Sequence, residues 1–202
     1  MKELTGYMKW KRAIPWSMVA FRAVLAPLLV VLALRLNASK LWFGAMIAAA
    51  CLSDIYDGIL ARRWGTATAR LRVADTVADT AFYLAVLAAI ILRHGQALRE
   101  RIGLLAAVLT LELLRALFDW IKFRRIASYH TYSAKLWGLS LAVASIALLC
   151  FNHGYWLLTL ALVLGILCDL EGLAISVILN RWTPDVKTLR AAFTLREHGQ
   201  SQ

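Results

Sequence analysis

The sequence predicts an all-α integral membrane protein with six transmembrane helices and an N-terminal interfacial amphipathic helix. Hydrophobic residues make up 61% of the 202 residues and the mean hydropathy is +0.65, whereas soluble domains contain roughly 45–50% apolar residues. The apolar residues form six segments, each about 20 residues long, which is the length of helix that crosses about 30 Å of hydrocarbon. Lysine and arginine also alternate in frequency between successive connections, as expected for a multi-pass protein.

The predicted spans are residues 16–36, 41–62, 72–93, 102–122, 134–152 and 154–181. Residues 1–13 precede them as an interfacial helix, with Leu4, Met8 and Lys11 along one stripe, although a frayed polar terminus is the alternative. We therefore expect an interfacial helix at 1–13, one six-helix membrane domain at 14–185 and a cytoplasmic tail at 186–202. Three prolines and no low-complexity tract leave no obvious linker.

The net charge is +11, and its distribution predicts the topology. In a six-span arrangement 16 lysines and arginines fall on one side and 5 on the other, with Arg22 and Arg115 inside spans. The positive-inside rule then places both termini in the cytoplasm, and we expect the cell's inner (cytoplasmic) membrane as the location. Because the basic residues bracket the spans instead of forming one patch, nucleic acid is not expected as a partner.

Four aspartates stand out within membrane-like sequence: Asp54, Asp57, Asp75 and Asp79. An ionisable group in a span costs roughly 2.5–3.5 kcal/mol on insertion scales and is by default a functional hypothesis. The first two are i, i+3 and the last two are i, i+4, so each pair shares one helix face. A short polar turn at 65–70 joins the two spans as an antiparallel hairpin, which brings the pairs to similar depth near the cytoplasmic end.

Four like charges cannot stay together in a dry site without protons, water or cations. Oxygen ligands suit hard divalent cations such as Mg²⁺ or Mn²⁺, and two such ions sharing four carboxylates typically hold a phosphate group. Gly58 would let a ligand approach the backbone, and Arg62, beside the small Ala61, could grip a phosphate oxygen. The structural alternative pairs these aspartates with Arg62, Arg72 or Arg115.

The same stretch resembles the signature of the CDP-alcohol phosphotransferase (CDP-alcohol phosphatidyltransferase) family, D-x2-D-G-x2-A-R-x8-G-x3-D-x3-D. Seven of its eight defined positions match; the departure is Leu71, which stands at the second glycine. Pro15, Arg22 and Pro27 match a second family pattern at the start of the first span. Leu71 leaves two interpretations: a shifted donor pocket, or a degenerate, non-catalytic member that binds lipid or metal as a scaffold.

The resemblance implies a membrane enzyme of phospholipid synthesis that moves a phosphatidyl group from CDP-diacylglycerol to an alcohol and releases CMP. It is closest to phosphatidylglycerophosphate synthase, so the expected acceptor is glycerol 3-phosphate. By position, Asp54, Asp57 and Asp75 would hold metal, Asp79 would touch the second metal and act as general base, and Gly58, Ala61 and Arg62 would line the CDP pocket. The family also implies two divalent cations (Mg²⁺ or Mn²⁺) and a homodimer.

Acceptor binding is assigned to Arg115 and Lys135. The alternative for Arg115 is an ion pair within its own helix, with Glu112 or Asp119, and for Lys135 a plain positive-inside lysine. Asp169 and Glu171 in the last span either pair with a basic residue of another span or line a polar cavity. A cation or proton transporter is the third hypothesis, disfavoured because transporter sites lie near the midplane between repeats.

Overall fold

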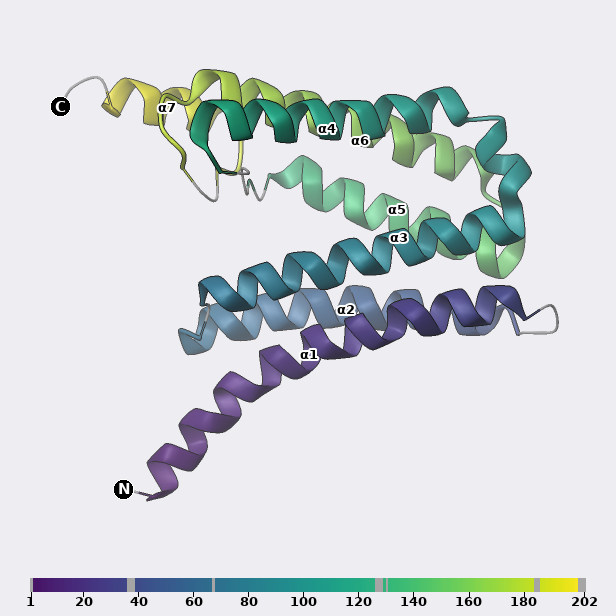
Figure 1. The fold of residues 1–202 in the computed structure, drawn as a ribbon, viewed down its shortest axis with the longest axis horizontal. Coiled ribbons are helices and arrows are strands. Elements are labelled where there is room, and N and C mark those ends of the chain that lie inside the picture. Colours follow the sequence, from purple (N-terminus) through teal and green to yellow (C-terminus); the bar gives the residue numbers. More distant parts are fainter. Residues whose placement is uncertain are drawn as a thin grey trace. The chain divides into compact units, whose positions relative to one another are not determined.

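The computed structural model describes residues 2–35, 39–66, 68–125, 129, 131–183 and 186–199, without the side chains of 2–9, 12, 69, 72, 198 and 199. Throughout these residues the regular structure is helical (Figure 1). The elements are α1 (Lys2–Leu34), α2 (Leu41–Trp64), α3 (Ala69–Arg99), α4 (Ile102–Phe123), α5 (Tyr132–Phe151), α6 (Tyr155–Ile178) and α7 (Leu189–Gly199). The side chains of Arg72, Leu4 and Met8, which figured in the predictions, lie outside the described residues.

The all-α membrane class is confirmed. Five helices of the described chain are long and apolar enough to cross a membrane: Ala13–Leu34, Leu41–Trp64, Val73–Arg99, Tyr132–Phe151 and Tyr155–Ile178. The protein is therefore a multi-pass membrane protein. The remaining predicted span corresponds to α4, whose 22 residues include Glu112, Arg115 and Asp119. Charged residues also occur in other spans, but every 18-residue stretch of α4 contains these three, and its crossing of the membrane stays a prediction.

Most predicted boundaries agree with the helices to within a few residues, and the differences have local causes. The helix that contains the first span starts at Lys2, so residues 2–13 continue into it without a break and Pro15 lies inside it. The predicted end of the third span at residue 93 coincides with a kink, because His94 has φ −138° and ψ 36°, after which α3 continues to Arg99. The last span ends at Ile178 instead of 181, where Leu179 turns to an extended conformation.

The turn between α2 and α3 is the short connection that the sequence predicted. Gly65 adopts a left-handed conformation (φ 65°) and its N–H donates to the carbonyls of Ala61 and Arg62, while Thr66 N–H also reaches Ala61. A glycine is favoured in this conformation because it has no Cβ to clash. At the other side of the turn the Thr68 hydroxyl accepts a hydrogen bond from the Leu71 N–H at 3.2 Å, which caps the start of α3.

The chain divides into two compact units, each described by itself. The first comprises Met1–Gln96 with Ser145–His153, that is, α1, α2, most of α3 and the end of α5. At the α2–α3 turn its three helices share a small apolar cluster of buried side chains: Val19, Ala61, Leu71 and Ala78. Far along α1, Arg93 of α3 donates to the carbonyls of Leu32 and Arg35, which fixes the end of α1.

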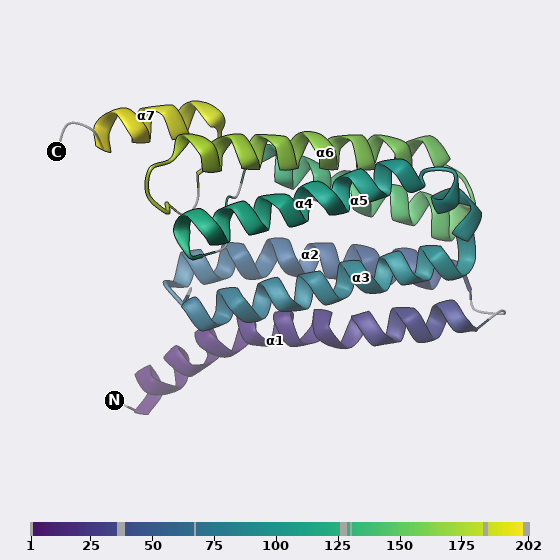
Figure 2. The same ribbon diagram turned by 45° about the horizontal axis from the view of Figure 1, so that its top comes forward.

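The second unit comprises Ala97–Ala144 with Gly154–Gln202. Within it α4 packs along α6, and α7 packs on α6 (Figure 2). Two glycines of α6 let large side chains lie against its backbone: Gly165 meets Trp137, and Gly172 meets Arg115. At the end of α6, Lys122 Nζ donates to the carbonyls of Ser176 (2.8 Å) and Val177 (2.9 Å), which satisfies groups that a helix end leaves unpaired.

Candidate active site

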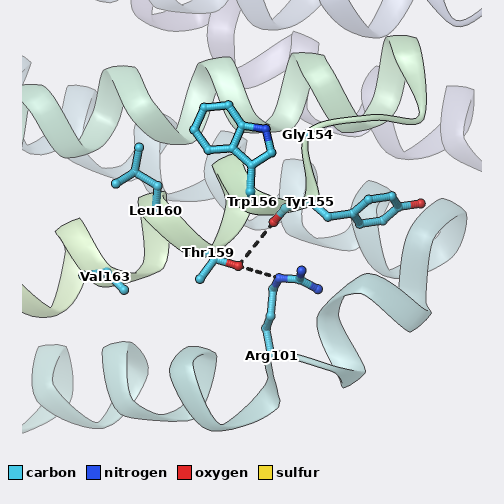
Figure 3. Close-up of a pocket in the computed structure, with 7 residues that line it drawn as sticks. All are labelled: Arg101, Gly154, Tyr155, Trp156, Thr159, Leu160 and Val163. Carbon is cyan, nitrogen blue, oxygen red and sulfur yellow. Dashed lines mark hydrogen bonds between the residues drawn. The ribbon is translucent and has the colours of Figure 1, made fainter.

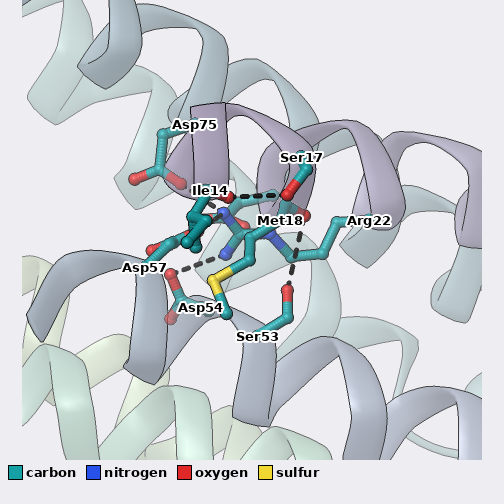
Figure 4. A network of polar contacts seen from close by, with 9 residues as sticks. Ile14, Ser17, Met18, Arg22, Ser53, Asp54, Asp57 and Asp75 are labelled. Atoms are coloured by element: carbon teal, nitrogen blue, oxygen red, sulfur yellow. Dashed lines mark hydrogen bonds and ion pairs between the residues drawn. The ribbon is translucent and has the colours of Figure 1, made fainter. Parts of the chain in front are cut away.

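The structure brings the four predicted aspartates of α2 and α3 to one point in the first unit. Each of them forms an ion pair with the same side chain, Arg22 of α1. Their spacing explains this arrangement, because i, i+3 and i, i+4 positions lie on one face of a helix. The antiparallel hairpin then turns the two acidic faces toward the same stretch of α1, as Figure 4 shows for Asp54, Asp57 and Asp75.

Arg22 engages the acids through both of its terminal nitrogens. Nη1 lies 2.7 Å from Asp54 Oδ1 and 2.8 Å from Asp79 Oδ1. Nη2 lies 2.5 Å from Asp57 Oδ2 and also donates to Asp75 Oδ1. The Arg22 side chain is 1% exposed, while Asp54, Asp75 and Asp79 are 51%, 34% and 31% exposed. The cluster is therefore closed on the α1 side and open on the side of these three acids.

Formal charges show that one guanidinium does not neutralise the cluster. Four carboxylates and one arginine sum to −4 + 1 = −3. Carboxylate oxygens of Asp54, Asp57 and Asp75 lie within 4.8 Å of one another, close enough to share a metal ion. An all-oxygen donor set with excess negative charge suits Mg²⁺ or Mn²⁺ rather than softer metals. The residues present thus fit the divalent ions that the sequence implied.

Of the residues predicted to line the donor pocket, Gly58 directly follows Asp57 on α2, and Ala61 and Arg62 lie about one turn further along. The guanidinium of Arg62 lies over Gly58: a Cβ built on that glycine would be 3.4 Å from Arg62 Nη1. Ala61 is buried in the apolar cluster with Val19 and Leu71. Leu71 is 6% exposed and packs between helices at the turn.

The second unit contains its own arginine–carboxylate group. Arg115 Nη2 donates to Glu112 at 2.6 Å, the ion pair within one helix that the sequence offered as an alternative. Arg115 Nε also lies 3.7 Å from Asp169 Oδ1 of α6, so Asp169 does face a basic residue of another helix. Glu171 instead accepts a hydrogen bond from Ser133. Lys135, the other predicted acceptor residue, is exposed and lies over the ring of Tyr132.

Sequence reasoning missed Arg22 as a member of the site. The structural alternative named Arg62, Arg72 and Arg115 as partners of the aspartates, but the described ion pairs of all four go to α1. A signal was present, because Arg22 is one of two basic residues that lie away from the ends of the predicted spans, and it matches the family pattern of the first span. A buried cation in a membrane helix requires an acidic partner, and the hairpin was the richest source.

Comparison with known proteins confirms the family that the sequence resembles. The sequence model of the CDP-alcohol phosphatidyltransferase family matches residues 12–167, which is more than half of the chain and includes Arg22 and all four aspartates. The chain therefore belongs to the CDP-alcohol phosphatidyltransferase family, and it is a membrane-embedded phosphotransferase of phospholipid synthesis. No match to the chain was found among curated proteins or among solved structures.

Proposed function

We propose that the protein transfers a phosphatidyl group from CDP-diacylglycerol to the hydroxyl of glycerol 3-phosphate and releases CMP. Family membership supports phosphatidyl transfer in general. The observation that supports chemistry at the acid cluster is the convergence of four carboxylates on one buried arginine, with three of the acids open to one side. A purely structural ion pair needs one carboxylate for one arginine, so three are in excess.

Two divalent ions, Mg²⁺ or Mn²⁺, are the proposed cofactors, with Asp54, Asp57, Asp75 and Asp79 as their ligands. Bound there, the ions would offset the charge of the donor diphosphate and of the departing CMP. The carboxylate oxygens of Asp54, Asp57 and Asp75, within 4.8 Å of one another, support this assignment.

Asp79 is the proposed general base. Its carboxylate is 31% exposed, so an acceptor hydroxyl can reach it, and its ion pair with Arg22 Nη1 fixes its orientation. In the reaction the acceptor oxygen bonds to the β-phosphorus of CDP-diacylglycerol while the bond from that phosphorus to the bridging oxygen breaks. The hydroxyl proton goes to Asp79, which requires an approach of about 2.6–3.2 Å. The bridging oxygen leaves as part of CMP.

The binding roles follow the sequence prediction. Gly58, Ala61 and Arg62 are proposed to contact the CDP moiety, supported by the exposed Arg62 guanidinium that lies over Gly58. Arg115 and Lys135 are the proposed ligands of the acceptor phosphate. Lys135 is exposed, whereas Arg115 would have to share its guanidinium between the acceptor and Glu112.

The remaining assignments concern the location, membrane topology, oligomeric state and domain limits of the enzyme. An excess of basic residues in the connections that include both termini supports an inner-membrane protein with cytoplasmic N- and C-termini. A homodimer is proposed from the family alone. The domain limits 1–13, 14–185 and 186–202 are retained as proposals, with the interfacial helix continuous with the first span.

The test is release of CMP from CDP-diacylglycerol by the purified full-length protein, with Mg²⁺ or Mn²⁺ and a panel of alcohols. We expect release with glycerol 3-phosphate and none after chelation of divalent ions. Release with another alcohol alone would overturn the proposed acceptor and keep the reaction. No release with any alcohol would overturn the proposed reaction and favour the non-catalytic interpretation of Leu71.

A further inference from the structure

A second surface feature, in the other unit, has the form of a lipid site. A groove of about 700 Å³ lies where α6 begins, lined by Arg101, Gly154, Tyr155, Trp156, Thr159, Leu160 and Val163 (Figure 3). All of these residues belong to the second unit. None of them is used by the proposed reaction, so the groove needs a separate explanation.

One end of the groove carries a positive charge held in a fixed position. Arg101 Nε donates to the Thr159 hydroxyl at 2.7 Å and Nη1 donates to the Ala97 carbonyl at 3.0 Å. Nη1 also contacts Glu100 at 3.2 Å, in an ion pair whose carboxylate is 58% exposed and therefore weak. These hydrogen bonds among the described residues involve Nε and Nη1 and not Nη2, and the guanidinium also lies over the ring of Tyr155, 5.9 Å from its centroid. The guanidinium is thus held by the protein among the lining residues at this end of the groove (Figure 3).

The other end of the groove is apolar and follows α6. Trp156, Leu160 and Val163 are spaced by four and three residues, so they share one face of the helix. They remain exposed by 68%, 44% and 39%, and from first to last they cover about 10 Å of helix length. Because α6 qualifies as a membrane-spanning helix from Tyr155 onward, this stripe runs from the membrane interface toward the hydrocarbon. Aromatic residues such as Trp156 and Tyr155 are typical of that interface.

We propose that this groove binds one anionic phospholipid, with its phosphate on Arg101 and an acyl chain along Trp156, Leu160 and Val163. A guanidinium suits a phosphate oxygen in both charge and geometry. The local sequence favours an anionic over a zwitterionic headgroup, because Arg99 and Arg101 against Glu100 leave one net positive charge in this turn. The apolar stripe distinguishes a lipid from a free phosphate ion, which has nothing to place there.

The test measures lipid binding to the purified full-length protein in neutral detergent by native mass spectrometry. The probes are phosphatidylglycerol, phosphatidylcholine of the same chains, and inorganic phosphate. We expect one phosphatidylglycerol whose binding weakens about tenfold in Arg101→Gln, the loss expected for one hydrogen bond to a charged group. Leu160→Trp, which fills the groove, should weaken binding several-fold. Arg99→Gln and Leu170→Trp are the matched controls, since both alter exposed positions outside the lining.

Each other outcome overturns part or all of the proposal. If Arg99→Gln and Arg101→Gln weakened phosphatidylglycerol binding equally, the lipid would be attracted by the positive charge of the whole turn, and the proposed site would be overturned. Equal binding of phosphatidylcholine would overturn the anionic selectivity. Full competition by inorganic phosphate at comparable concentration, with no effect of Leu160→Trp, would reassign the site to a free anion. Because CMP release is measured separately, failure here leaves the proposed reaction intact.

Discussion

Each unit of the protein contains an arginine that faces two or more carboxylates, and the two clusters differ in their net charge. Arg22 faces four aspartates from two other helices, three of them at least 31% exposed. Arg115 faces Glu112 of its own helix and Asp169, whose side chain is 1% exposed. The formal charge is −3 in the first cluster and +1 − 2 = −1 in the second.

The difference separates a cluster suited to binding from one suited to stability. Excess negative charge next to an opening attracts cations. A nearly balanced cluster at a packed helix contact mainly stabilises the fold, because loss of one partner would leave a buried charge unpaired. The close fit of Arg115 against Gly172 supports the second role, because an added Cβ there would lie 2.9 Å from the arginine side chain. Changes in the first cluster should therefore alter turnover, whereas changes in the second should alter stability and, through the proposed role of Arg115, the KM for the acceptor.

The largest expected effect is that of Asp79→Asn on turnover. Loss of a general base lowers kcat by roughly 100-fold to 10,000-fold, while Arg22 keeps three carboxylate partners and the fold is retained. The measurement is CMP release at saturating substrates, with the melting temperature as a check on folding. The paired variant Asp169→Asn should keep kcat within about threefold. A kcat for Asp79→Asn near that of the wild type would remove Asp79 from the catalytic role.

The next effect is on stability, from Arg115→Met. Removing one partner of a buried ion pair costs about 3–5 kcal/mol, because Asp169 is left buried without its cation. Unfolding by titration with sodium dodecyl sulfate measures this change. Combining Arg115→Met with Asp169→Leu should recover a large part of the loss. If the double variant regains stability and its KM for glycerol 3-phosphate stays raised, Arg115 also binds the acceptor; an unchanged stability in Arg115→Met would contradict the comparison.

Divalent ions should raise the stability of the folded protein, and their removal should lower it, only through binding at the first cluster. Saturation at about 100 times the dissociation constant stabilises a folded protein by about 2.7 kcal/mol, and we expect a shift of this order with Mg²⁺ or Mn²⁺ that EDTA reverses. Asp57→Asn should remove most of the shift and Asp169→Asn should preserve it. Equal shifts in both variants would show that the ions bind elsewhere.

The smallest effects come from one glycine in each region. Gly172→Ala forces the Cβ against Arg115 Cδ and Nη1, both 2.9 Å away, and overpacking of this kind costs about 1–3 kcal/mol. Gly58→Ala meets its nearest atom, in the Arg62 guanidinium, at 3.4 Å, so the fold should tolerate it and gain up to about 1 kcal/mol of helix propensity. The expected effect of Gly58→Ala is on substrate binding, as a raised KM for CDP-diacylglycerol. A destabilised Gly58→Ala variant would show that Gly58 is needed for packing.

Hydropathy and charge spacing were enough to predict the helices and the acidic hairpin. Apolar runs of about 20 residues mark spans directly, and i, i+3 and i, i+4 spacing determines which side chains share a face. The hairpin register followed from the short turn, whose glycine at 65 closes α2. Family resemblance supplied the class of enzyme, which the sequence comparison confirms.

Contacts between distant helices could not be predicted in the same way. Periodicity does not say which helix a face meets, so the pairing of Arg22 with the hairpin appeared only in three dimensions. The same holds for Leu71, whose place among Val19 and Ala61 depends on the packing of three helices. The kink at His94 has no proline to announce it, and Gly95 beside it does not by itself predict a break, because a single glycine is tolerated within a helix.

Arg22, as a counter-ion supplied by the protein itself, has a consequence for membrane insertion and folding. Helices enter the bilayer before the finished site exists, and a hairpin that carries four carboxylates is poorly suited to hydrocarbon. Because Arg22 is translated first and lies on the preceding helix, the acids meet a partner as soon as α2 and α3 pack on α1. Biogenesis in the membrane can thus proceed ahead of any supply of cofactor.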